Sequence, residues 1–160
     1  MALRTIREYG DEVLEKPCKV VKLMTPGLSV LIDDMFETMY EANGVGLAAP
    51  QVNKSLALFV IDTEAFLDEG DTEKAVKKAF VNPEITETSE KRCSFSEGCL
   101  SVPGINEEVL RPEGVRISYQ DVDITKCQAE VRFPVTKKPA GLSLPVEWVS
   151  ERIIRPWSHR

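Results

Sequence analysis

The sequence contains one histidine, His159, among its 160 residues. This scarcity excludes any site that needs two histidines from the same chain. It also argues against a cysteine hydrolase, because a cysteine nucleophile needs a histidine base beside it. His159 lies among polar neighbours, and a lone histidine in such surroundings is more often solvated than bound to a metal.

Cysteines and long apolar runs are also scarce. The four cysteines (Cys18, Cys93, Cys99 and Cys127) are too few and too scattered for a disulfide scaffold, so we expect reduced thiols. No stretch approaches about eighteen consecutive apolar residues, and the segment MALRTIREYGDE carries charges where a signal peptide needs an apolar stretch. We therefore expect a cytoplasmic protein that does not enter a membrane.

The sequence has no surplus of basic charge. Its net charge is -6, which argues against a general nucleic-acid binder. The charge is uneven, because residues 1–130 hold 24 acidic and 14 basic side chains, whereas residues 131–160 hold 2 acidic and 6 basic. Length and composition predict a single domain over residues 1–160, in which residues 131–160 depart from the rest.

The best-defined helix signal covers residues 26–40. Thr25 can accept a hydrogen bond from an early backbone N–H, and Pro26 stands where a helix needs no N–H donor. Apolar residues then recur at helical spacing: Leu28, Leu31, Ile32, Met35 and Met39. Residues 41–44 end in Asn-Gly, which breaks the helix.

Three short segments have strand patterns. Residues 56–61 form an apolar run, residues 79–83 read as a strand that closes in a turn, and residues 115–122 alternate apolar and polar side chains. Residues 64–78 have little apolar content and predict a surface loop with room for a short helix. The pattern favours an α+β fold of mainly antiparallel sheets packed around a helix.

Two glycine-containing stretches do not have the period of a core element. The first is GVGLAAPQ, from Gly44 to Gln51, whose small residues allow a close approach of the main chain to a ligand or another strand. It is not a phosphate loop, because the lysine and hydroxyl of a Walker loop and the third glycine of a dinucleotide fingerprint are missing. A tight turn beside a close-packed strand explains it equally well.

The second stretch is EGCLS, from Glu97 to Ser101, and its central residue has three interpretations. Cys99 could be a buried structural thiol, a nucleophile or a metal ligand. The residues alone leave the structural thiol and the metal ligand open.

Taken together, the two stretches closely resemble the first two signature motifs of the peptide deformylases. Further matching text is the helix at residues 35–39, Val81-Asn82-Pro83, residues 97–103, Arg111-Pro112 and the strand that ends at residues 119–121, so the resemblance covers roughly residues 1–130. That family removes the formyl group from the N-terminal methionine of newly made proteins, using a divalent metal. The metal is usually iron(II), replaceable by nickel, cobalt or zinc.

The resemblance implies a role for each matching residue. Cys99 would be a thiolate metal ligand, and the Gln51 side-chain amide and the Leu100 backbone N–H would stabilise the oxyanion on the formyl carbon. The residues that it implies for binding the substrate are Gly44, Val45, Gly46, Glu97 and Gly98. The implied partner is the formyl-methionyl N-terminus of a peptide, at the ribosome, and neither nucleic acid nor membrane.

The third family motif, H-E-x-D-H on a C-terminal helix, is absent. Its two histidines would complete the metal site and its glutamate would move the proton, but here Pro134, Pro139 and Pro145 leave at most a short helix over residues 146–155. We therefore expect a shortened or altered C-terminal helix, and weak or no turnover. The sequence leaves open whether a metal is retained and whether the altered surface causes oligomerisation. The alternative function is a catalytically silent protein that binds extended peptides without hydrolysis.

Overall fold

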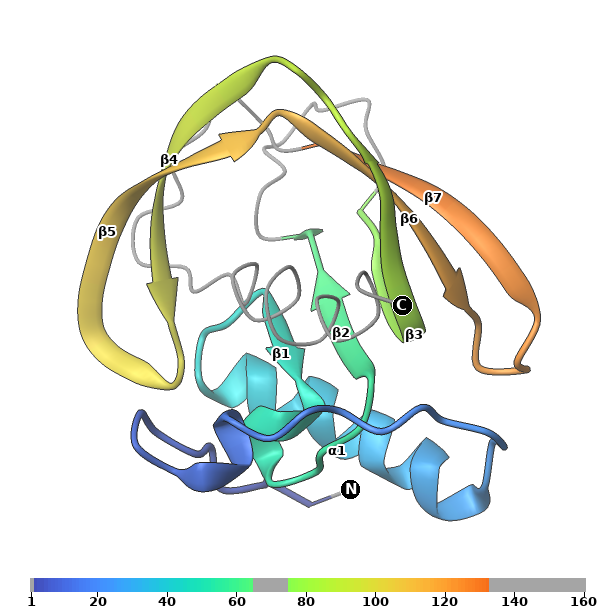
Figure 1. Cartoon of the computed structure of the whole chain (residues 1–160). Helices are drawn as coiled ribbons and strands as arrows, with labels where there is room; N and C mark the ends of the chain where they lie inside the picture. Colours follow the sequence, from blue (N-terminus) through green and yellow to red (C-terminus); the bar gives the residue numbers. More distant parts are fainter. Residues whose placement is uncertain (1, 65–74, 133–160) are drawn as a thin grey trace.

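The computed structural model describes residues 2–64 and 75–132, and it contains two antiparallel sheets and one α-helix (Figure 1). In chain order the elements are η1 (Glu12–Leu14), α1 (Pro26–Glu41), β1 (Gly46–Ala48), η2 (Ala49–Val52), β2 (Leu58–Asp62), β3 (Lys77–Thr88), β4 (Arg92–Cys99), β5 (Val102–Pro112), β6 (Gly114–Gln120) and β7 (Lys126–Arg132). The larger sheet has the order β1-β2-β3-β6-β7, and β4 and β5 form a separate hairpin. The predicted α+β class is confirmed.

Helix α1 begins and ends as the sequence predicts. The Thr25 hydroxyl accepts a hydrogen bond from the Leu28 N–H at 3.2 Å, and Pro26 occupies the first turn. The chain leaves the helix through Asn43, whose φ of 53° is left-handed, a conformation that asparagine tolerates better than most residues. The Gly44 N–H then bonds to the Met39 carbonyl at 2.8 Å, so the first glycine of GVGLAAPQ is fixed against the end of the helix.

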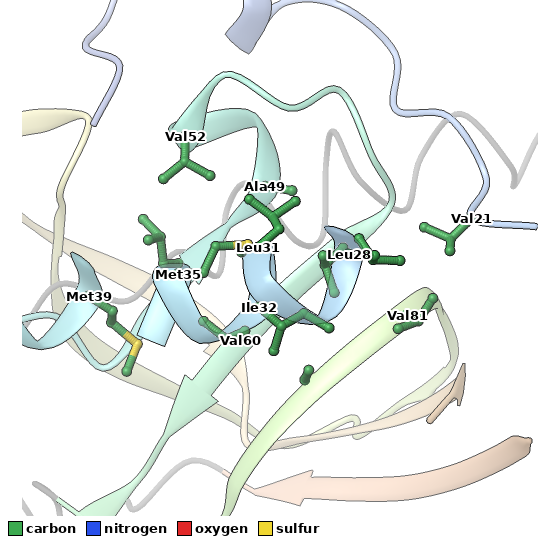
Figure 2. Packing of buried hydrophobic residues seen from close by; sticks show 13 residues of the cluster. Val21, Leu28, Leu31, Ile32, Met35, Met39, Ala49, Val52, Val60 and Val81 are labelled. Atoms are coloured by element: carbon green, nitrogen blue, oxygen red, sulfur yellow. The ribbon is translucent and has the colours of Figure 1, made fainter. Parts of the chain in front are cut away.

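The apolar face of α1 packs on one face of the larger sheet (Figure 2). Thirteen buried residues form this cluster: Val21, Leu28, Leu31, Ile32, Met35, Met39, Leu47, Ala49, Val52, Leu58, Val60, Ala79 and Val81. A second cluster covers the opposite face: Cys18, Ala48, Ala57, Phe59, Phe80, Val115, Ile117 and Tyr119. Since successive strand side chains point to opposite faces, a strand buried on both sides reads as the continuous apolar run seen at residues 56–61.

The predicted strands are present with two corrections. Strand β2 starts two residues later than predicted, and β6 covers most of residues 115–122. The predicted turn at Asn82-Pro83 is wrong, because β3 continues to Thr88 with its register shifted between Val81 and Glu84. Asn82 is left-handed, with φ of 48°, and its side chain bonds to both the N–H and the carbonyl of Val21 at 2.8 Å. The turn signal therefore marks a bulge that joins the sheet to the N-terminal region.

The loop predicted at residues 64–78 is wrong at its end, because Lys77 and Lys78 already belong to β3. Residues 65–74 lie outside the described residues, as do the predicted helix at residues 146–155 and His159. Within the described part of the chain, no helix has the length and apolar character needed to span a membrane.

Candidate functional site

The two glycine-containing motifs come together at Gly44 and Leu100. A Cβ atom at Gly44 would lie 2.7 Å from Leu100 Cδ1, closer than real Cβ contacts. It would also lie 3.4 Å from the Met39 side chain and the Met39 carbonyl oxygen. Glycine at this position therefore lets the second motif approach the end of α1.

Strand β1 follows directly and lies at the edge of the larger sheet. It pairs only with β2 among the described strands, with Gly46 opposite Ile61 and Ala48 opposite Phe59. Val45 and Leu47 are buried, and the Val45 carbonyl accepts a hydrogen bond from the Asp62 N–H at 2.9 Å. The backbone of the first motif is thus hydrogen-bonded to β2 on one side, and its other side forms the edge of the sheet.

Gln51 is fully buried and its side-chain amide is oriented by two neighbours. Its Oε1 accepts a hydrogen bond from the Ala48 N–H at 2.9 Å, which identifies the oxygen, because a backbone N–H is only a donor. Its Nε2 therefore donates to Ser101 Oγ at 3.0 Å. The last residue of the first motif is joined in this way to the last residue of the second.

The N-terminal segment binds both motifs through its backbone. The Arg7 N–H donates to the Gln51 carbonyl at 2.7 Å, and the Tyr9 N–H donates to the Ser101 carbonyl at 2.8 Å. Farther upstream in the same segment, the Ala2 N–H, at 2.6 Å, and the Arg4 guanidinium donate hydrogen bonds to Asp34 on α1. These two partners, the Ala2 N–H first, lower the pKa of Asp34 below its usual value. Apolar periodicity does not reveal this segment.

The hairpin carries the remaining predicted residues. Glu97 is buried and forms a two-pronged ion pair with Arg111, with both N–O distances 2.9 Å. Gly98 stands against Asn106, whose Oδ1 would lie 2.6 Å from a Cβ at position 98. The register shifts between Gly98 and Cys99, and Cys99 is a half-buried thiol at the end of β4. The register shift changes the direction of the chain at the end of β4, just before Leu100 and Ser101.

Comparison with known proteins shows the family of the chain. Residues 3–132 match the family model described as polypeptide deformylase. The chain belongs to the peptide deformylase family. It is 43% identical over 120 residues to a peptide deformylase of Christiangramia forsetii, and 47% identical over 130 residues to one of Agathobacter rectalis. These alignments cover 71% and 81% of this chain.

The fold agrees with a solved deformylase. The crystal structure of the Thermotoga maritima peptide deformylase matches with a TM-score of 0.71 and 36% identity, over 83% of this chain and 84% of that one. The chain spans 61% of the length of the C. forsetii relative and 75% of the A. rectalis relative. The match to the family model ends at residue 132, close to the change of charge at residue 131.

The metal site of the deformylase family can be tested against the described donors. Cys99 offers one sulfur at the position that the resemblance implies. Over residues 2–64 and 75–132, no group of three or more histidine, cysteine, aspartate or glutamate side chains is placed to hold a metal ion. A catalytic zinc site, for comparison, takes three protein ligands. The residues that the structure describes therefore do not fit the metal of the family, and Cys99 as a ligand stays a prediction.

The predicted site residues fall into two groups in the structure. Gly44, Gln51 and Leu100 lie around the junction of the two motifs, with Val45 and Gly46 on the adjoining β1 edge. Glu97 and Gly98 lie within the hairpin, beside Arg111 and Asn106, and Cys99 ends the same strand, β4. The sequence analysis does not predict Ser101 as a partner of Gln51, because a hydrogen bond between residues 50 positions apart leaves no local signal.

Proposed function

We propose that this protein recognises the formylated methionine at the N-terminus of newly made polypeptides, the substrate of peptide deformylases. The observation that carries the proposal is the junction of the two motifs, where the Gln51 amide and residues 100–101 meet. There the second N–H of the Gln51 amide and the backbone N–H of Leu100 would donate to the formyl oxygen. Two donors aimed at one oxygen are the arrangement that stabilises an oxyanion, and one such donor is worth roughly 3 to 4 kcal/mol of barrier.

The rest of the peptide would lie in extended form along Gly46. Strand β1 is an edge strand, and an edge strand can bind a peptide by main-chain pairing while the side chains are accommodated separately. Because Gly46 has no side chain, a bound peptide could come close to the backbone of β1 there. Affinity would then come from the backbone, and preference for the formyl group from Gln51 and Leu100.

The reaction of the family is hydrolysis of the formyl amide to formate and a free amino terminus, supported by a divalent metal. We propose that this chain carries out that reaction weakly or not at all, because the donors among residues 2–64 and 75–132 do not fit the metal and the sequence contains no H-E-x-D-H motif. Losing the acid and base of that motif alone would cost roughly 10² to 10⁴ in rate. Binding without hydrolysis is the second candidate function, and it is favoured because the described residues offer no group of ligands for a metal ion. Action at the ribosome, in the cytoplasm, is part of the same proposal.

A direct test compares the binding of formyl-Met-Ala-Ser and Met-Ala-Ser by calorimetry. The wild-type protein should prefer the formylated peptide, because one hydrogen bond contributes about 0.5 to 1.5 kcal/mol. Gln51→Leu, which keeps the size of the side chain and removes its amide, should abolish the preference. Equal binding of the two peptides by the wild-type protein would refute the proposal. Formate release, measured in the same samples with added iron(II) or nickel(II), separates the enzyme from the silent binder.

A further inference from the structure

We propose that Ser101 is a positioning residue, which fixes the Gln51 amide in the orientation needed to meet a formyl oxygen. The inference rests on the proposed function and adds to it the residue that makes Gln51 selective. Both side chains are fully buried, and Gln51 Nε2 donates to Ser101 Oγ at 3.0 Å. The two residues are 50 positions apart, and the hydrogen bond joins the two motifs.

The geometry of an amide explains why a second partner is needed. The terminal torsion of a glutamine side chain is broad and poorly defined by sterics. The Ala48 N–H fixes Oε1 at 2.9 Å, but one hydrogen bond still allows the amide plane to rotate about that contact. The hydrogen bond to Ser101 Oγ is the second contact, and it fixes the amide plane. An amide nitrogen carries two N–H donors, so Ser101 takes one and directs the other.

The main chain around Ser101 is fixed as well. The Ser101 carbonyl accepts from the Tyr9 N–H and the Gln51 carbonyl accepts from the Arg7 N–H, at 2.8 and 2.7 Å. One short segment, Arg7–Tyr9, thus holds both residues of the pair, and upstream it is tied to α1 where Arg4 donates to Asp34. The hydroxyl of Ser101 is therefore presented from a backbone that cannot shift without breaking these bonds.

A purely structural role for Ser101 makes a different prediction. If the hydroxyl only filled space or satisfied a buried donor, replacing it would change stability and would affect all peptides equally. A positioning role affects the formylated peptide selectively, because only that ligand presents an oxygen to the amide. The ratio of the two affinities therefore separates the roles.

The experiment measures dissociation constants for formyl-Met-Ala-Ser and Met-Ala-Ser in the wild-type protein, Ser101→Cys and Ser101→Thr. Cysteine is close to serine in size but is a weak hydrogen-bond acceptor, whereas threonine keeps the hydroxyl. We expect Ser101→Cys to lose the preference for the formylated peptide, a change of roughly two- to tenfold in the ratio, the range for one hydrogen bond. Its affinity for Met-Ala-Ser should stay within about twofold on the same scale. Ser101→Thr should retain the preference.

The outcomes are distinguishable. A wild-type preference that Ser101→Cys retains unchanged would overturn the positioning role and leave the proposed function standing. An absence of preference in the wild-type protein itself would overturn both. As a second readout, the side-chain amide signals of Gln51 in a nitrogen-15 spectrum should shift and exchange faster with water in Ser101→Cys, and unchanged signals would also contradict the inference.

Discussion

The candidate site is built from two regions that are held together by different interactions. The first region runs from the start of α1 to the end of β2 (residues 25–62) and contains the first motif, and the second is the β4–β5 hairpin (residues 92–112). In the first region Met35, Met39 and Leu47 are fully buried, and packing holds the motif. In the hairpin, Ile105 and Leu110 are more than half exposed, and a buried ion pair joins the strands. The first region is thus held by many apolar contacts, and the hairpin by a few polar ones. We therefore expect stability to depend on buried apolar side chains in the first region and on the ion pair in the hairpin.

The largest expected effect is in the packed region. Met35→Ala should lower the free energy of unfolding by about 2 to 5 kcal/mol, because it removes a buried side chain and leaves a cavity. The matched control is Leu110→Ala in the hairpin, where the side chain is 60% exposed and the change should stay within about 0.5 kcal/mol. Chemical denaturation measures both. Equal losses would erase the contrast between the regions.

The hairpin should instead depend on its ion pair. Arg111→Met leaves the buried Glu97 carboxylate without this partner, and we expect a loss of about 3 kcal/mol in the free energy of unfolding. Arg116→Met is the control, since its ion pair with Glu87 also bridges two neighbouring strands but is exposed, and should cost about 1 kcal/mol or less. The double variant with Glu97→Leu should recover most of the loss. Similar losses for the two arginine variants would contradict the account.

The contact between the two motifs, Gly44 against Leu100, has no room for a larger side chain. Gly44→Ala places a methyl group 2.7 Å from Leu100 Cδ1, so the Leu100 side chain must move, at a cost of about 1 to 3 kcal/mol. Leu100→Ala in the same chain should remove most of that added cost. A double-mutant cycle from thermal or chemical unfolding measures the coupling. Strictly additive effects would mean that the two motifs do not meet as described.

A smaller effect is expected at the start of α1. Thr25→Ala removes the hydroxyl that caps the helix and should lower the free energy of unfolding by about 1 kcal/mol. Thr25→Ser keeps the cap and should be close to the wild type. Urea denaturation of both variants checks the assignment, and it fails if serine and alanine prove equally costly.

The smallest effect should appear only at alkaline pH. Burial raises the pKa of the Cys18 thiol from 9.0 to about 11. The folded state therefore holds this proton more tightly than the unfolded state, so the stabilisation is complete below pH 9 and is lost as the pH rises toward 11. Cys18→Ala should reduce the decline in the free energy of unfolding over this interval, relative to its own value at pH 7. Parallel curves for the two proteins would show that the thiol does not contribute.

The sequence predicts the first region better than the hairpin for a physical reason. Helix α1 and β2 are buried along a stripe or on both faces, and such burial leaves a periodic or continuous apolar pattern. Strands β4 and β5 are largely polar, so apolar periodicity predicts no element there. Asn82 shows the same limit at one residue, because an asparagine before a proline can mark either a turn or a bulge.

The motifs of the candidate site can be read from the sequence, but its contacts cannot. GVGLAAPQ and EGCLS indicate roles for Gln51, Cys99 and Leu100 through their resemblance to a family, and these roles stay predictions. Nothing in the local sequence indicates that Gln51 pairs with Ser101, because hydrogen bonds between residues 50 positions apart depend on the fold. The bonds from Arg7 and Tyr9 come from backbone N–H groups, which any residue except proline could supply.

The central proposal is that residues 2–64 and 75–132 keep the peptide-recognition half of a deformylase site, while no group of side chains among them is placed to hold its metal. The most direct measurement is the number of metal ions per chain after incubation with cobalt(II) or iron(II) and removal of the unbound metal. We predict well under one retained ion per chain, with peptide binding unaffected by a chelator. One tightly retained ion per chain, together with formate release that the chelator abolishes, would contradict the account.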